Sequence, residues 1–176
     1  MNIFKKALSY VLILAVLISA FPAAVFAEED EYRISNQYMS FTFNQKTGGF
    51  AIETAEGNPQ KALDNDIPLL YAEDKERSSG TSFITVRIGD DDYIFGQNYA
   101  FFGIDSSLGT VKVSNEQRLI EIPWTIKGIT VTLTAALDND TQSKTTGNVG
   151  LSFKVENNSG KDENVSIRLL LDTALG

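Results

Sequence analysis

Two short acidic segments carry the residues best suited to binding a metal ion. They are residues 90–92, which are three consecutive aspartates, and residues 138–140, which read Asp-Asn-Asp. Carboxylate and amide oxygens are the ligands that Ca²⁺ prefers in extracellular loops. Neither segment continues with the central glycine and the late glutamate of a calcium-binding loop. We therefore favour solvated, charged turns, keep a Ca²⁺-stabilised loop as the alternative, and predict no metal site and no cofactor.

Aromatic residues in one segment suggest carbohydrate binding as a second chemistry. Flat rings near carboxylates can form a platform for a sugar, but aromatic side chains in a β-sandwich more often fill the core, where each buries about 150–250 Å². Trp124 is the only tryptophan and follows Pro123 at an expected strand bend, so we favour a core position for it. The other members of the set are Tyr93, Phe95, Tyr99, Phe101 and Phe102.

Catalytic chemistry has little support in the composition. The chain has no histidine and no cysteine, which removes the usual general base, thiolate chemistry and Cys-ligated zinc. It has no Gly-x-Ser-x-Gly elbow and no glycine-rich phosphate loop before a helix. A glycosidase needs only two carboxylates about 5–10 Å apart, and the 23 acidic residues leave that open. We predict no catalytic residue and leave enzymatic activity undecided, with the expectation against it.

Asp172 is a single carboxylate just beyond the last expected strand, between Leu171 and Thr173. It could pair with an arginine or belong to a site completed by further residues. Aspartate side chains commonly accept hydrogen bonds from nearby backbone groups in turns. We therefore favour a turn-capping role for Asp172.

Alternating apolar and polar residues predict β-strands as the elements that position these side chains. The clearest example is residues 129–135, in which isoleucine, valine, leucine and alanine alternate with threonine. Such a period of two is typical of antiparallel sheets with one buried face. The fold class is therefore all-β, an antiparallel two-sheet β-sandwich, with a closed barrel as the alternative. The expected strands are residues 32–35, 38–43, 50–54, 83–88, 92–96, 99–102, 110–113, 118–126, 129–136, 149–156 and 165–171.

Turn residues separate these strands and predict hairpins. Glycine, asparagine and aspartate tolerate the backbone angles of tight reversals. Two stretches, residues 55–80 and 138–147, are poor in apolar residues and are expected to be long loops, where binding sites and tolerated insertions both occur. The expected turns are residues 44–49, 89–92, 127–128 and 157–161.

Residues 1–27 have the pattern of a signal peptide. Lys5 and Lys6 precede an uncharged apolar run, Pro22 interrupts it, and Val25 and Ala27 occupy positions that signal peptidase accepts. We expect cleavage after Ala27, with a retained membrane anchor as the alternative because the run is close to the roughly 20 residues that span a bilayer. Both interpretations place the remaining chain outside the cytoplasm, secreted or at the cell surface.

Residues 28–176 are expected to form a single β-sandwich domain, for which 149 residues are sufficient. A domain truncated at its C-terminus is the alternative, because a strong strand pattern lies close to Gly176. This part has 13 basic and 23 acidic residues, a net charge of −10. Nucleic acids and anionic lipids would be repelled, so we expect no nucleic-acid partner and no membrane association after signal cleavage.

Both ends of the expected domain resemble a known kind of protein. Residues 150–176, GLSFKVENNSGKDENVSIRLLLDTALG, and residues 34–52, ISNQYMSFTFNQKTGGFAI, are similar to segments of uncharacterised exported bacterial surface proteins, of Firmicute type, with a β-supersandwich or immunoglobulin-like domain. The resemblance implies a fold and an extracellular location. It implies no site residue.

The function expected from these observations is a non-catalytic extracellular β-sandwich module with a surface, adhesion or structural role. The alternative is an N-terminal accessory or carbohydrate-binding domain of a larger carbohydrate-active enzyme. The partner would be a cell-surface polysaccharide or protein. The signal sequence and the lack of a recognisable catalytic set favour the first interpretation.

Overall fold

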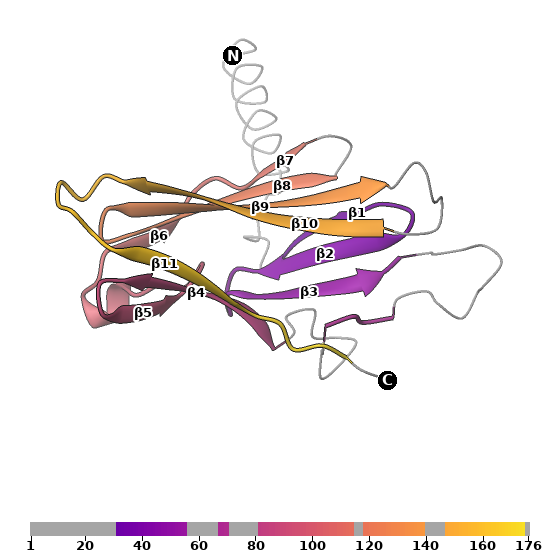
Figure 1. The fold of residues 1–176 in the computed structure, drawn as a ribbon, viewed down its shortest axis with the longest axis horizontal. Helices are drawn as coiled ribbons and strands as arrows, with labels where there is room; N and C mark the ends of the chain where they lie inside the picture. The colour runs from indigo at the N-terminus through magenta and orange to yellow at the C-terminus, as the bar shows by residue number, and fades with distance from the viewer. Residues whose placement is uncertain (1–30, 56–66, 71–80, 115–117, 140–146, 175–176) are drawn as a thin grey trace, which may run out of the picture.

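The computed structural model describes residues 31–55, 67–70, 81–114, 118–139 and 147–174. Two antiparallel β-sheets pack face to face in this part of the chain (Figure 1). The predicted all-β sandwich is thereby confirmed. The expected signal peptide and most of the two long loops lie outside the described residues.

The first sheet has six strands in the order β1-β2-β3-β4-β11, and β5 also pairs with β4. All its pairs are antiparallel, and Val165 of the last strand lies opposite Ile88. The strands are β1 (Glu31–Ser35), β2 (Met39–Asn44), β3 (Gly49–Thr54), β4 (Ser82–Ile88), β5 (Asp91–Ile94) and β11 (Val165–Leu170).

The second sheet has five strands in the order β10-β9-β8-β6, and β7 also pairs with β8. A two-residue turn joins β8 to β9, with φ of 52° at Lys127 and 77° at Gly128. Positive φ at both positions is the geometry that tight hairpins require. The strands are β6 (Ser106–Leu108), β7 (Lys112–Ser114), β8 (Leu119–Ile126), β9 (Ile129–Asn139) and β10 (Gly147–Asn157).

The core lies between the two sheets and follows the period of two in the sequence. Along β8 and β9 every second side chain faces the first sheet and is fully buried, as expected when one face of a sheet is covered. Each buried isoleucine, valine or leucine among them stabilises the fold by about 1.5–3 kcal/mol relative to an exposed position. The eight residues are Ile120, Ile122, Trp124, Ile126, Ile129, Val131, Leu133 and Ala135.

Two predicted elements differ from the structure around residue 100. Residues 99–102 were expected to form a strand, but Ala100–Phe102 form a 3-10 turn, η1, which ends at Gly103 in the left-handed region. The segment is apolar without alternation, so it lacks the pattern of one buried and one solvent-exposed face that indicates a half-buried strand. β6 was not predicted, because Ser106 and Ser107 are polar and the strand has only three residues.

The connection between β10 and β11 was expected to close a hairpin, and this prediction is wrong. Asn157 does bind the backbone of Ser159 in a turn, with an N–O distance of 3.0 Å. However, β10 pairs with β9 in the second sheet and β11 pairs with β4 in the first. The turn therefore carries the chain from one sheet to the other, as Figure 1 shows.

Candidate ligand-binding cleft

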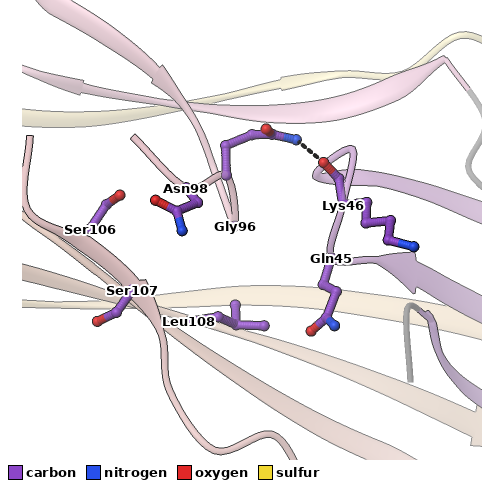
Figure 2. A pocket seen from close by; sticks show the side chains of 8 residues that line it. Gln45, Lys46, Gly96, Asn98, Ser106, Ser107 and Leu108 are labelled. Carbon is purple, nitrogen blue, oxygen red and sulfur yellow. Dashed lines mark hydrogen bonds between the residues drawn. The ribbon is translucent and has the colours of Figure 1, made fainter. Parts of the chain in front are cut away.

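A cleft of about 500 Å³ opens where the two sheets meet near η1. One wall is the turn between β2 and β3, and the other is formed by residues 96–98 and β6. Figure 2 shows Ser106 and Asn98 on one side and Gln45 and Lys46 on the other. The lining residues are Gln45, Lys46, Gly96, Gln97, Asn98, Ser106, Ser107 and Leu108.

The wall from the first sheet is a turn held by Asn44. Its side-chain oxygen accepts hydrogen bonds from the backbone nitrogens of Lys46 at 2.9 Å and Thr47 at 3.0 Å. Its side-chain nitrogen donates to Glu31 of β1 at 2.9 Å. Asparagine is common in turns because its amide can form such local bonds. This arrangement fixes the backbone that presents Gln45 and Lys46 to the cleft.

The core supports the opposite wall directly. The indole nitrogen of Trp124 donates to the carbonyl oxygen of Gln97 at 3.0 Å, and the Gln97 side chain donates to the carbonyl oxygen of Lys46 at 2.7 Å. Gly96 has a φ of 83°, and a Cβ placed on it would lie 2.7 Å from the ring of Phe43. Glycine is therefore required at this position. The two walls are joined to each other and to the buried tryptophan.

The loop beyond residue 98 is closed at its base and carries exposed rings at its tip. Tyr99 donates its backbone N–H to the hydroxyl of Ser106 at 2.6 Å, and its ring packs against Trp124 with a centroid distance of 6.4 Å. The two following phenylalanines are not covered: Phe101 is 93% exposed and Phe102 is 71% exposed. Their rings meet edge to face at 5.5 Å. Adjacent exposed apolar side chains form a continuous apolar surface, and such surfaces are found at interaction sites when they are large enough.

The cleft offers neutral hydrogen-bonding groups. The side-chain nitrogens of Gln45 and Asn98 and the hydroxyl of Ser107 make no hydrogen bond within the described part of the chain. Amides both donate and accept, and a hydroxyl does the same. Among the described lining residues none is a carboxylate, and Lys46 is the one with a charged side chain. The neutral groups of the arrangement can bind a polar, uncharged ligand.

The predicted aromatic platform is divided by the structure. Trp124 and Phe95 are fully buried and Tyr93 is 5% exposed, so the core position predicted for Trp124 is confirmed. Tyr99 is partly buried against the core, whereas Phe101 and Phe102 are exposed. Burial separates the two groups because Phe95 and Trp124 pack edge to face at 5.6 Å between the sheets, whereas η1 projects beyond them.

Two of the three aspartates of residues 90–92, Asp91 and Asp92, form ion pairs. Asp92 accepts two hydrogen bonds from Arg87, at 2.7 and 2.8 Å, and its second oxygen lies 3.3 Å from Arg168 of β11. The hydrogen bonds from Arg87 hold the pKa of Asp92 below its usual value of 3.8. This outcome favours the charged-turn interpretation over calcium binding.

Asp91 has partners of its own. The hydrogen bond from Lys127, and then that from Tyr93, lower the pKa of Asp91. The ammonium of Lys127 lies 3.2 Å from the carboxylate, and its own pKa is raised by Tyr93 first and Asp91 second. No group of three or more acidic residues suited to a metal ion occurs among the residues with described positions. The side chains of residues 138–140 lie outside that set.

Asp172 has a structural role, but it does not cap a local turn as expected, because its partners lie 91 and 90 positions earlier in the chain. Its carboxylate accepts a hydrogen bond from the hydroxyl of Thr81 at 2.5 Å, and its backbone N–H donates to the hydroxyl of Ser82 at 3.0 Å. These bonds tie the end of β11 to the start of β4. The aspartate therefore serves the fold.

The residues that line the cleft were missed by reasoning from the sequence. Gln97, Asn98, Ser106 and Ser107 are common residues in an irregular segment, and no motif or spacing distinguishes them. Comparisons with protein-family models, with curated proteins and with solved structures give no match for this chain. None of the described segments is a helix long and apolar enough to cross a membrane.

Proposed function

We propose that this chain is a non-catalytic, exported β-sandwich module that binds a ligand at a surface through the cleft between β6 and the β2–β3 turn. The observation that carries this proposal is the wall chemistry: neutral amides and hydroxyls, held in place by hydrogen bonds that lead back to Trp124. Sites that orient a ligand typically need a few such fixed polar groups. A surface or adhesion role follows from binding without turnover.

The charged groups argue against hydrolysis at this site. A glycosidase requires two carboxylates, one of which stays protonated near neutral pH. No carboxylate lines the cleft in the part of the chain that the structure describes, and the carboxylates of Asp91 and Asp92 have lowered pKa values because of the hydrogen bonds from Lys127 and Arg87 respectively. These aspartates remain ionised near neutral pH, and their carboxylates are bound to basic side chains. They are poorly suited to act as a general acid.

The sequence supports action outside the cell. Residues 1–27 have the signal-peptide pattern. The resemblance of residues 34–52 and 150–176 to exported bacterial surface proteins supports the same location and a supersandwich or immunoglobulin-like form of the sandwich.

The test is binding of the purified domain to cell envelopes from the organism that produces it. We expect saturable binding that is lost in the double variant Asn98→Asp/Ser107→Ala. Asn98→Asp keeps the oxygen that accepts from Ala100 at 2.9 Å but removes the donor that faces the cleft. The matched control Asn148→Asp/Ser152→Ala makes the same chemical changes at exposed positions of β10 and should bind like the parent.

Two results would overturn the proposal. One is equal envelope binding by the parent and the cleft variant. The other is turnover of a polysaccharide, ester or phosphate substrate by the purified domain that the same variant abolishes. The second candidate, an accessory carbohydrate-binding domain of a larger enzyme, is favoured specifically by the exposed pair Phe101 and Phe102.

A further inference from the structure

We infer that the ligand of the cleft is an uncharged glycan that packs the apolar face of a sugar against the exposed ring of Phe101 or Phe102 while its hydroxyls bind the polar walls. This inference rests on the proposed function and specifies its ligand class. It is carried by two features of one loop: polar groups at its base, on Asn98 and Ser106, and exposed rings at its tip.

The exposed rings have a cost that a bound ligand would offset. Burying a phenylalanine side chain is favourable by about 1.5–3 kcal/mol relative to leaving it exposed. Here two adjacent phenylalanines remain exposed. Tyr99 anchors them, because its hydroxyl accepts from the backbone of Ile94 at 2.7 Å and its ring contacts Phe102 at 6.4 Å. The rings are thus presented by a supported loop. A sugar has the matching shape, with apolar C–H faces and a polar rim.

The polar walls match the rim of such a ligand. A sugar hydroxyl donates one hydrogen bond and accepts others, so it needs partners of both kinds. The amides of Gln45 and Asn98 and the hydroxyl of Ser107 provide donors and acceptors without a net charge. A site built to hydrogen-bond hydroxyl groups rejects analogues that lack them, because its own polar groups would then be unpaired.

The charge pattern favours a neutral glycan over an acidic one. Among the described residues that line the cleft, Lys46 is the one with a charge, and Figure 2 shows its ammonium pointing away from Ser106 and Asn98. Its contribution toward the opposite wall is the carbonyl oxygen that accepts from Gln97. The chain as a whole has a net charge of −8, which repels a polyanion.

The experiment measures binding of the purified domain to a glycan array, followed by titration with soluble oligosaccharides of the neutral and uronic-acid classes. We expect neutral glycans to bind. We expect Phe101→Ala/Phe102→Ala to weaken that binding by about tenfold or more, since aromatic contacts contribute up to about 1.5 kcal/mol beyond buried area. Val113→Ala/Leu170→Ala is the control, because both residues are about half exposed and lie on β7 and β11.

A second arm separates this inference from the proposed function. Envelopes are treated with periodate, which cleaves the vicinal diols of sugars. Loss of binding to treated envelopes supports a glycan ligand. If binding survives the treatment but is still lost in Asn98→Asp/Ser107→Ala, the cleft remains the binding site and the inference of a glycan ligand is overturned. Selective binding of uronic-acid oligosaccharides overturns the neutral class, and a flat array with periodate-resistant binding overturns the inference as a whole.

Discussion

The inward-facing side chains of β9 and β10 have the same sequence pattern but very different surroundings. On β9, Val131 and Leu133 are fully buried between the sheets. On β10, Phe153 is only partly covered and Val155 is 41% exposed. The difference arises because β9 has a strand on each side, whereas β10 pairs with β9 alone in the described sheet. Alternation therefore predicts which way a side chain points but not how deeply it is buried.

The first sheet repeats this contrast. Ile84 and Val86 of β4 are fully buried, while Leu169 of the adjacent strand β11 is 36% exposed. β11 is held by other means, because Arg168 pairs with Asp92 and Asp172 binds Thr81 and Ser82. Strands at the centre are stabilised mainly by apolar burial, and the outer strand β11 gains from polar contacts as well.

The largest effect is expected in the centre, at Trp124. Trp124→Ala removes a fully buried ring and should lower the free energy of unfolding by about 3–5 kcal/mol. It also removes the donor to Gln97, so ligand binding should weaken even under conditions where the variant remains folded. Urea denaturation with a binding assay at low temperature measures both. A loss below about 1 kcal/mol would contradict the central role assigned to this strand.

The comparison of β9 with β10 can be tested with the same substitution on each. Leu133→Ala should cost about 2–5 kcal/mol, because it leaves a cavity in the core. Leu151→Ala, opposite Ala135 on the neighbouring strand, should cost less than half as much because water can fill the space beside an outer strand. Denaturant midpoints with matched slopes provide the measurement. Equal losses would show that β10 is as well covered as β9.

A smaller, pH-dependent effect is expected at Asp92. Its folded-state pKa is lowered by Arg87, so its stabilising contribution is present above the unfolded pKa of about 4 and is lost as the pH falls through the folded value. Asp92→Asn should therefore lower the melting temperature at pH 6 and have little effect near pH 2. Asp90→Asn is the control, because Asp90 is exposed in the same turn. A difference that is constant with pH would refute this assignment.

The smallest effect on stability is expected at Phe101. Because its side chain is 93% exposed, Phe101→Ala should change the free energy of unfolding by no more than about 0.5 kcal/mol. Ligand binding should nevertheless fall. Thermal unfolding of this variant is compared with that of Phe95→Ala, which removes a fully buried ring in the same aromatic segment and should lower stability far more. A large loss of stability would indicate that the ring has a structural partner.

Most of the fold could be predicted from local patterns, and the candidate site could not. The hairpin at Lys127 and Gly128 and the alternation of β8 and β9 depend on neighbours close in sequence. The cleft joins Gln45 to Ser107 across 62 positions of the chain, and its residues have no distinctive spacing. Such a site becomes visible only when the two sheets are placed together.

The sequence by itself determined the all-β class, the antiparallel pairing of neighbouring strands and the buried place of Trp124, because apolar periodicity and turn residues act over short distances. The tertiary structure alone decided that β10 and β11 belong to different sheets and that Phe95 is buried while Phe101 is exposed. The physical reason is that burial depends on what the rest of the chain covers, and a residue's own neighbours in sequence carry no record of that.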